Sequence, residues 1–282
     1  MVVTRAATLT RSITTGTIVR WFALGVIVIW VVAPFVPLWL WSFSLRWRFP
    51  HLLPEVWSTR AWLYLLKPSS GVLNATIDSL VIAVVVTVVS VAISIPAGRA
   101  LGLYRFRGKR IMEFLILAPT IIPGLASVFG VHGLFLRYNL ANSLFGVILV
   151  HLISSVTYAT MVMWGVFSNY NTEFEEQGRV LGAGPIRNFR YVTWPAIFPG
   201  IVVAALFSFL LSWYQYLLTL IIGGGKVQTL AMLLFNFARS GDRPVAGAVS
   251  IIFMIPALIV LFVTSKYLTG ENAAVSGLGG GR

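Results

Sequence analysis

Six long stretches of mostly apolar residues run along the chain, with short polar segments between them. They cover residues 20–44, 75–103, 111–136, 143–168, 194–223 and 245–268. Each is long enough for a membrane-spanning helix, which needs about 20 apolar residues in a row. Proline occurs inside several stretches, and we interpret these prolines as kinks because neighbouring helices can satisfy the freed carbonyl groups. The pattern predicts an all-α membrane protein with about six transmembrane helices.

The six predicted spans form one transmembrane domain, residues 20–268, between two polar ends. Residues 1–19 form a basic tail, and residues 269–282 form a Gly-rich tail that we expect to be flexible. The tail before the first span contains Arg5 and Arg11 and no acidic residue, a composition that transit peptides share. No small-residue cleavage site follows, so a basic tail is the favoured interpretation.

The composition supports a membrane protein and excludes several other classes. Hydrophobic residues make up 58% of the chain and charged residues only 10%, whereas a soluble domain carries about 25% charged residues. The absence of cysteine excludes disulfides, zinc–thiolate sites and thiol catalysis. The net charge of +13 would be compatible with binding to nucleic acid, but in a membrane protein it is better explained by Lys and Arg retained in cytoplasmic loops.

The distribution of basic residues predicts the orientation. The larger share of the 21 Lys and Arg residues lies on the side that holds both chain ends, so we expect both termini to be cytoplasmic. The opposite side carries an unusually basic loop, residues 44–68, whose Trp and Tyr residues are typical of the membrane interface. In this orientation the segment between the fourth and fifth spans is cytoplasmic.

That cytoplasmic segment has the local pattern of two short helices. Thr172 precedes Glu175 by three residues, which is the spacing of a capping box, and Glu175 and Arg179 form a favourable i, i+4 pair. A narrow apolar face follows at Phe174, Gly178 and Leu181. Gly182 can end the first helix and Pro185 can begin the second. An amphipathic interface helix without a partner is the alternative, but such helices are usually basic and this one begins acidic.

The same segment resembles the EAA loop of permease subunits from binding-protein-dependent ABC importers. That loop has the form E-A-A-x-x-x-G, nine residues, then I-x-L-P. Here residues 176–178 read E-Q-G, Gly182 follows after three residues, and V-T-W-P stands at 192–195 after nine more. The Glu, the Gly, the Pro and all the spacings agree, while Gln177 and Gly178 replace the two alanines. The likeness extends over roughly residues 70–268.

The resemblance implies a type I ABC importer permease fold in the bacterial cytoplasmic membrane. It implies the transmembrane pore subunit of an ATP-driven importer that moves a small solute delivered by an external binding protein. Residues 228–262 and the loop residues 42–58 look closer to permeases for spermidine/putrescine, iron, thiamine or phosphonate than to maltose-type ones. A sugar or polyol remains open as the alternative solute.

The resemblance also implies the partners and a cytoplasmic coupling helix that binds an ATPase subunit. The partners are a second permease, identical or homologous, two cytoplasmic ATPase subunits, an extracytoplasmic substrate-binding protein and the lipid bilayer. The coupling residues would be Phe174, Glu175, Glu176, Gly178, Leu181, Gly182 and Pro195. No Walker A pattern occurs in the chain. We therefore expect no enzyme activity and no cofactor in this chain, with ATP and Mg on the partner ATPase.

Polar residues recur at helical spacing inside two of the apolar stretches. The candidates for lining a pore are His151, Ser155 and Tyr158 in the fourth span and Ser208, Ser212, Gln215 and Thr219 in the fifth. Membrane Ser and Thr also pack helices, so both interpretations stay open, although Gln is costly to bury without use. In the loops of the opposite side, Arg46, Arg48, Arg239, Asp242 and Arg243 are candidate docking points for the binding protein, or simply solvated.

Catalytic and metal sites are not expected. His51, His132 and His151 are far apart and lack metal-ligand spacing, and no paired carboxylates or nucleophile motif is found. A self-contained secondary transporter or channel is the alternative from another class. That alternative predicts an ionisable residue inside the membrane, and Glu113 lies only at the cytoplasmic edge of the third stretch.

Overall fold

The computed structural model describes residues 15–48, 50–122 and 124–268. Residues 1–14 and 269–282, which hold most of the two predicted tails, lie outside the described residues. The first helix already begins within the predicted basic tail, at Thr15. The elements of the first part of the chain are α1 (Thr15–Val32), α2 (Phe35–Ser42), β1 (Ser44–Arg46), β2 (Val56–Trp57), α3 (Arg60–Leu65), η1 (Pro68–Ser70) and α4 (Val72–Leu103).

The second half of the described chain is also helical. Its elements are α5 (Lys109–Ile121), α6 (Gly124–Arg137), α7 (Leu144–Ser168), α8 (Glu173–Val180), α9 (Pro185–Asn188), η2 (Phe189–Thr193), α10 (Trp194–Trp213), α11 (Leu217–Gly223), α12 (Leu230–Ser240) and α13 (Arg243–Leu268). The predicted cytoplasmic segment therefore does form two short helices, α8 and α9. The π-helical turn η2 joins them to α10.

Within the described residues, four helical segments are long and apolar enough to cross a membrane: α4, α7, the segment 185–213 and α13. The helices α1 and α2, bent by 46° at their junction, would add a fifth span. The predicted third span is divided between α5 and α6, of 13 and 14 residues. Ile122 is extended (ψ 132°) directly before a proline in the sequence, and a residue in that position avoids the α region.

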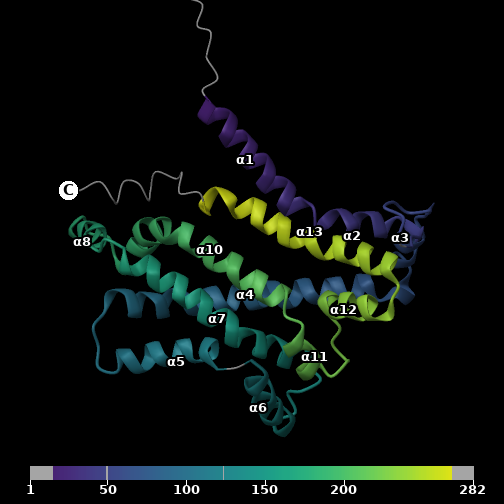
Figure 1. The fold of residues 1–282 in the computed structure, drawn as a ribbon. Coiled ribbons are helices and arrows are strands. Elements are labelled where there is room, and N and C mark those ends of the chain that lie inside the picture. The colour runs from purple at the N-terminus through teal and green to yellow at the C-terminus, as the bar shows by residue number, and fades with distance from the viewer. Residues whose placement is uncertain (1–14, 49, 123, 269–282) are drawn as a thin grey trace, which may run out of the picture.

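The helix α4 lies against α7 and α10 in the middle of the described structure (Figure 1). Small residues allow this close approach: a Cβ added at Gly98 would lie 2.6 Å from Cβ of Met163, and one at Gly102 would lie 2.6 Å from Cβ of Phe167. Such contacts are typical of membrane helices, which associate through close packing and not through the hydrophobic effect.

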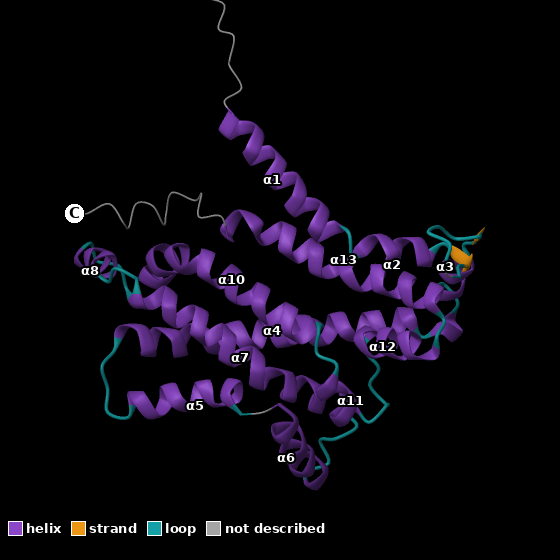
Figure 2. Ribbon diagram, viewed as in Figure 1, coloured by secondary structure: helices purple, strands orange, loops and turns teal. Residues whose placement is uncertain are grey.

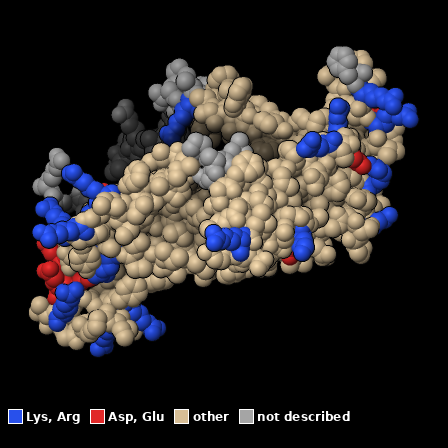
Figure 3. Space-filling model, turned by 90° about the horizontal axis from the view of Figure 1, so that it is seen from below, with Lys and Arg blue, Asp and Glu red and all other residues tan. Residues whose placement is uncertain are grey.

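The molecule is elongated, and its two ends differ. One end carries α8, and the opposite end carries α3 and the two strands (Figures 1 and 2). We call the latter the hairpin end: β1 and β2 pair antiparallel there, and α3 packs against α13 at the same end. On the face drawn in Figure 3 charged side chains gather at both ends, and a few also lie on the otherwise uncharged surface between them. This distribution suits helices surrounded by lipid.

Candidate functional site

One buried carboxylate fastens α8 to α4. The side chain of Glu175 is only 6% exposed. Arg99 of α4 donates to it through both terminal nitrogens, Nη1 to Oε1 at 3.0 Å and Nη2 to Oε2 at 2.6 Å. Thr193 of η2 donates its hydroxyl to Oε1 at 2.8 Å. A two-pronged guanidinium–carboxylate contact is among the stronger polar interactions in proteins and fixes orientation as well as distance. The loop is thereby tied to the helix that leads into the membrane.

The electrostatics of this site favour a charged carboxylate. Burial by itself raises the pKa of Glu175, but the hydrogen bonds from Arg99 and Thr193 outweigh burial and leave the pKa below its usual range. The predicted i, i+4 partner, Arg179, is also present, with Nη2 at 3.8 Å from Oε2. It is the more distant of the two guanidinium groups and is largely exposed, so its contribution is minor.

The predicted capping box is wrong. Thr172 is in the α region and its hydroxyl makes no cap hydrogen bond. The carboxylate of Glu175 points to Arg99 instead of back to the helix start, because a guanidinium is a stronger partner than a backbone amide. Asn171 takes the capping role: its Oδ1 accepts from the amide of Glu173 at 2.9 Å, and its Nδ2 donates to that residue's carboxylate at 3.1 Å.

The predicted apolar face also divides into two parts. Gly178 lies against the second short helix, where a Cβ would stand 2.7 Å from Oδ1 of Asn188. The amide of Asn188 in turn donates to the carbonyl of Glu175 at 2.7 Å. Gly178 therefore permits the close approach of α8 and α9. Phe174 and Leu181, the other two residues of the predicted face, are exposed and are therefore available to a partner.

The turn between α8 and α9 exposes large apolar side chains. Leu181, Val180 and Ile186 are each more than four-fifths exposed, and Gly182 in the turn has φ of +82°, a conformation that favours glycine. We call these three side chains the apolar tip. Glu176 beside it is exposed. Val180 and Ile186 were not among the predicted coupling residues. Their position on either side of the Gly-rich turn could have indicated that they are exposed with Leu181. Pro195, the last of the predicted set, stands in the first turn of α10.

Most of the predicted pore residues are enclosed between helices of this chain. His151 of α7 lies 2.9 Å from the hydroxyl of Ser212 through Nδ1, and 2.9 Å from that of Thr219 through Nε2. Ser155 and Ser208 are fully buried as well. The helix α10 ends at Trp213, so the polar residues predicted in the fifth span do not lie along one continuous helix. In this conformation His151, Ser212 and Thr219 connect α7 to α10 and α11. The role of all five residues in a pore stays a prediction.

Gln215 and Tyr158 have a different environment. Gln215 lies in the break between α10 and α11 and lines a cavity of about 600 Å³, together with parts of α5, α6 and α7. Gln215 and Ser154 are the polar side chains among the described residues that line it. Both interrupted spans, α5–α6 and α10–α11, border this cavity, and irregular backbone at membrane depth is tolerated where it lines one. Tyr158 is 40% exposed.

Comparison with known proteins decides the family. Residues 90–269 match the model of the family described as binding-protein-dependent transport system inner membrane component. The chain belongs to this family. It is 30% identical over 218 residues to the spermidine/putrescine transport system permease homologue of Mycoplasma genitalium, covering 75% of this chain and 76% of that protein. It is also 30% identical over 207 residues to the diacetylchitobiose uptake system permease of Streptomyces coelicolor, covering 72% and 73%.

A solved structure shows the same fold. The chain superimposes with a TM-score of 0.70 on a chain of a bacterial ABC transporter involved in the import of the acidic polysaccharide alginate, covering 93% of this chain and 99% of that one at 21% identity. The protein is therefore an inner-membrane permease subunit of an ABC importer with the type I fold, as the resemblance predicted. The family assignment replaces the alternative of a self-contained secondary transporter or channel.

Proposed function

We propose that this permease forms one half of a transmembrane path, and that its α8–α9 segment receives movement from a cytoplasmic ATPase. The observation that supports this most directly is the pairing of an exposed apolar tip with a buried ion pair behind it. The tip offers Val180, Leu181 and Ile186 to a partner groove, in the manner of a helix bound in a groove. The contact of Glu175 with Arg99 then connects α8 rigidly to α4.

The roles of the acidic residues are divided in this proposal. Glu176 is exposed and is available to a polar rim on the ATPase. Glu175 is enclosed by Arg99 and Thr193 and positions the segment from within. A buried contact of this kind transmits displacement because packed elements move as units and do not deform continuously.

The full assembly requires partners on both sides of the membrane. Two ATPase subunits, which hold ATP and Mg, bind at the α8 end, and this end is cytoplasmic with both termini. A second permease, identical or homologous, completes the path, and an external binding protein delivers the solute at the hairpin end. The permease itself performs no ATP hydrolysis in this proposal.

A polyamine or similar small solute is the first candidate for the cargo, with iron, thiamine or phosphonate as related possibilities. The spermidine/putrescine permease homologue supports this choice. A sugar or polyol is the second candidate, supported by the diacetylchitobiose permease at equal identity. The uncharged polar groups of Gln215 and Ser154 in the cavity also suit hydroxyl-rich solutes.

The test is purification of the permease from its native membrane in a mild detergent, with mass identification of the proteins that accompany it. The wild type is compared with Leu181→Glu, which places a charge in the apolar tip, and with Leu63→Glu, an equally drastic change at an exposed position on α3. We expect the ATPase to accompany the wild type and Leu63→Glu and to be lost with Leu181→Glu. Retention of the ATPase by Leu181→Glu would contradict docking through the tip.

A further inference from the structure

Three buried serines inside the long apolar helices have no hydrogen-bond partner among the described residues. They are Ser90 of α4, Ser155 of α7 and Ser208 of α10, and each is at most 1% exposed. We call them the serine trio. A buried hydroxyl without a partner costs free energy comparable to a lost hydrogen bond, so a group of three at one place points to a missing partner.

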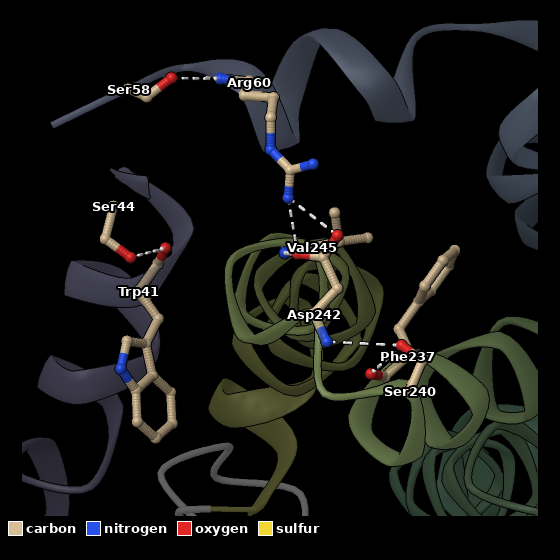
Figure 4. A network of polar contacts seen from close by, with 8 residues as sticks. All are labelled: Trp41, Ser44, Ser58, Arg60, Phe237, Ser240, Asp242 and Val245. Carbon is tan, nitrogen blue, oxygen red and sulfur yellow. Dashed lines mark hydrogen bonds and ion pairs between the residues drawn. The ribbon is translucent and has the colours of Figure 1, made fainter. Parts of the chain in front are cut away.

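Other serines of the chain find a partner in their own backbone. Ser94, one turn after Ser90 on α4, donates to the carbonyl of Val91 at 3.0 Å. Ser44 and Ser240 do likewise, each donating at 2.9 Å to a carbonyl three residues earlier (Figure 4). This local bond is the usual one for serine inside a helix. The trio does not make it, so its hydroxyls are available to a ligand between the helices.

The register of α4 against α7 places Ser90 level with Ser155. The two helices lie against each other (Figure 1). A Cβ at Gly98 of α4 would lie 2.6 Å from Cβ of Met163 of α7, 65 positions later in the chain, and the contact one turn further along has the same spacing. Ser90 and Ser155 are also 65 positions apart. They therefore face each other about two turns before Gly98.

The helix α10 brings the third serine to the same level. His151 of α7 lies 2.9 Å from the hydroxyl of Ser212 of α10, and Val166 of α7 lies against Gly200 of α10. Residue numbers rise along α7 as they fall along α10, so these two helices run in opposite directions. One turn from the contact of His151, this register places the trio's serines on α7 and α10 opposite each other.

Contacts between α4 and α10 close the third side of the triangle. Val91 and Ile95 of α4 pack with Ile201 and Ala204 of α10 in one apolar cluster. The serine trio therefore lies where three helices meet. Its hydroxyls are not hydrogen-bond partners of one another, and polar groups that face each other beyond hydrogen-bond distance are typically bridged by water.

We propose that the serine trio binds one water molecule that links α4, α7 and α10. A hydroxyl can both donate and accept, and a buried water makes about three hydrogen bonds, so three serines supply a complete set of partners. A metal cation fits less well, because hard cations take about six or more oxygen ligands that usually include carboxylates. The helices α7 and α10 contain no Asp or Glu, and Asp78 of α4 lies about three turns before Ser90.

This inference goes beyond the proposed function and does not depend on it, since it concerns contacts within one chain. Its consequence is mechanical. The helix α4 holds α8 through Arg99, and α7 and α10 are joined through His151 and Ser212. A water that bonds all three helices makes them one unit, in the way that polar groups hold membrane helices together.

The first test compares thermal midpoints of the detergent-solubilised permease. The variants are Ser90→Ala, Ser155→Ala and Ser208→Ala. The matched control is Ser94→Ala, because Ser94 is equally buried on α4 but bonds its own helix. Each trio variant loses a hydrogen bond to the water and should have a midpoint about 2–4 °C below that of the control.

The sign of the shift decides between the explanations. Alanine in place of a hydroxyl that has no partner at all removes a buried unpaired polar group, which raises the midpoint. Midpoints of the trio variants at or above that of Ser94→Ala would therefore overturn the inference.

Two further measurements identify the ligand. A cryo-electron microscopy map of the purified permease, at a resolution that shows ordered water, should contain a peak about 2.5–3.0 Å from each of the three Oγ atoms. A map that shows other buried waters but no such peak would contradict the proposal. The midpoint should be the same in sodium chloride and choline chloride at equal ionic strength. A sodium-specific rise that Ser155→Ala abolishes would assign the site to a cation and overturn the water.

Discussion

The carboxylate of Glu175 accepts hydrogen bonds from Arg99 and Thr193 and is buried under the loop that contains it. From the sequence we expected it to cap α8 and to contact the ATPase. Neither expectation included the ion pair with Arg99, because Arg99 is 76 positions away in the chain. Spacing rules describe neighbours within one helix, whereas a long-range ion pair depends on how α4 and α8 meet.

Substitution of Glu175 should destabilise the isolated permease. Glu175→Gln leaves Arg99 partly buried without its counter-charge, and removing one partner of a buried pair costs about 3 kcal/mol. We expect a clear fall in the thermal midpoint of the detergent-solubilised protein, followed by tryptophan fluorescence. Glu176→Gln changes the adjacent, exposed carboxyl and serves as the control. Equal midpoints for the two variants would contradict the assigned role of the ion pair.

The same pair predicts a dependence on pH. The pKa of Glu175 lies lower in the folded protein than the usual value of about 4.3 for Glu. Its contribution to stability is therefore fully present above that usual value and is lost as the pH falls through the lowered folded-state pKa. The wild type should lose an increment of thermal stability below about pH 4 that Glu175→Gln does not lose. Parallel pH curves for the two proteins would argue against the charged pair.

At the scale of elements, the hydrophobic pattern predicted the helical fold and the two short helices of the coupling segment. It did not predict the breaks in the third and fifth spans. The first break had a signal in the sequence, the proline at position 123, because a residue directly before proline avoids the α region. Ile122 is extended accordingly. The second had none: the residues between α10 and α11 are Tyr-Gln-Tyr. Tertiary contacts flank that break, with Trp213 donating to the carbonyl of Phe253 and His151 reaching Ser212 and Thr219.

The contact between α8 and α9 predicts the effect of one methyl group. Gly178→Ala restores the alanine of the EAA pattern but places Cβ 2.7 Å from Oδ1 of Asn188. We expect a loss of about 1–3 kcal/mol, the usual cost of overpacking. Gly165→Ala, at a helical position with open space around it, should be neutral or slightly stabilising. Thermal midpoints measure both. A stable Gly178→Ala variant would mean that the two helices are less closely packed than described.

His151 is buried between helices and Gln215 lines a cavity, so their substitution should have different effects. His151→Leu removes the link between α7 and α10–α11, so its main effect should be a lower thermal midpoint. Gln215→Leu changes a cavity wall and should reduce solute uptake at least several-fold in proteoliposomes with an unchanged midpoint. Uptake and midpoint are measured on the same preparations. An unaffected uptake rate with Gln215→Leu would remove the cavity from the proposed path.

At the scale of the whole molecule, the two ends present different chemistry. The α8 end offers an apolar tip backed by an ion pair, and at the hairpin end Arg46, Arg48 and Arg243 line a common hollow. The resemblance to the EAA loop implied that the segment at the α8 end contacts a partner, and several charged residues of the opposite loops were candidate docking points or simply solvated. Which side chains face outward could not be predicted, because exposure in these loops depends on contacts such as Gly178 with Asn188 and Arg60 with Asp242.

The central claim, that the apolar tip contacts an ATPase, is tested most directly by site-specific crosslinking. The chain contains no cysteine, so single cysteines introduced into it can be labelled without background from the permease. Leu181→Cys and the control Lys67→Cys would carry a photoreactive maleimide in native membranes, with products identified by mass spectrometry. We predict an ATPase adduct with Leu181→Cys and none with Lys67→Cys. Efficient labelling of Leu181→Cys without any ATPase adduct would contradict the account.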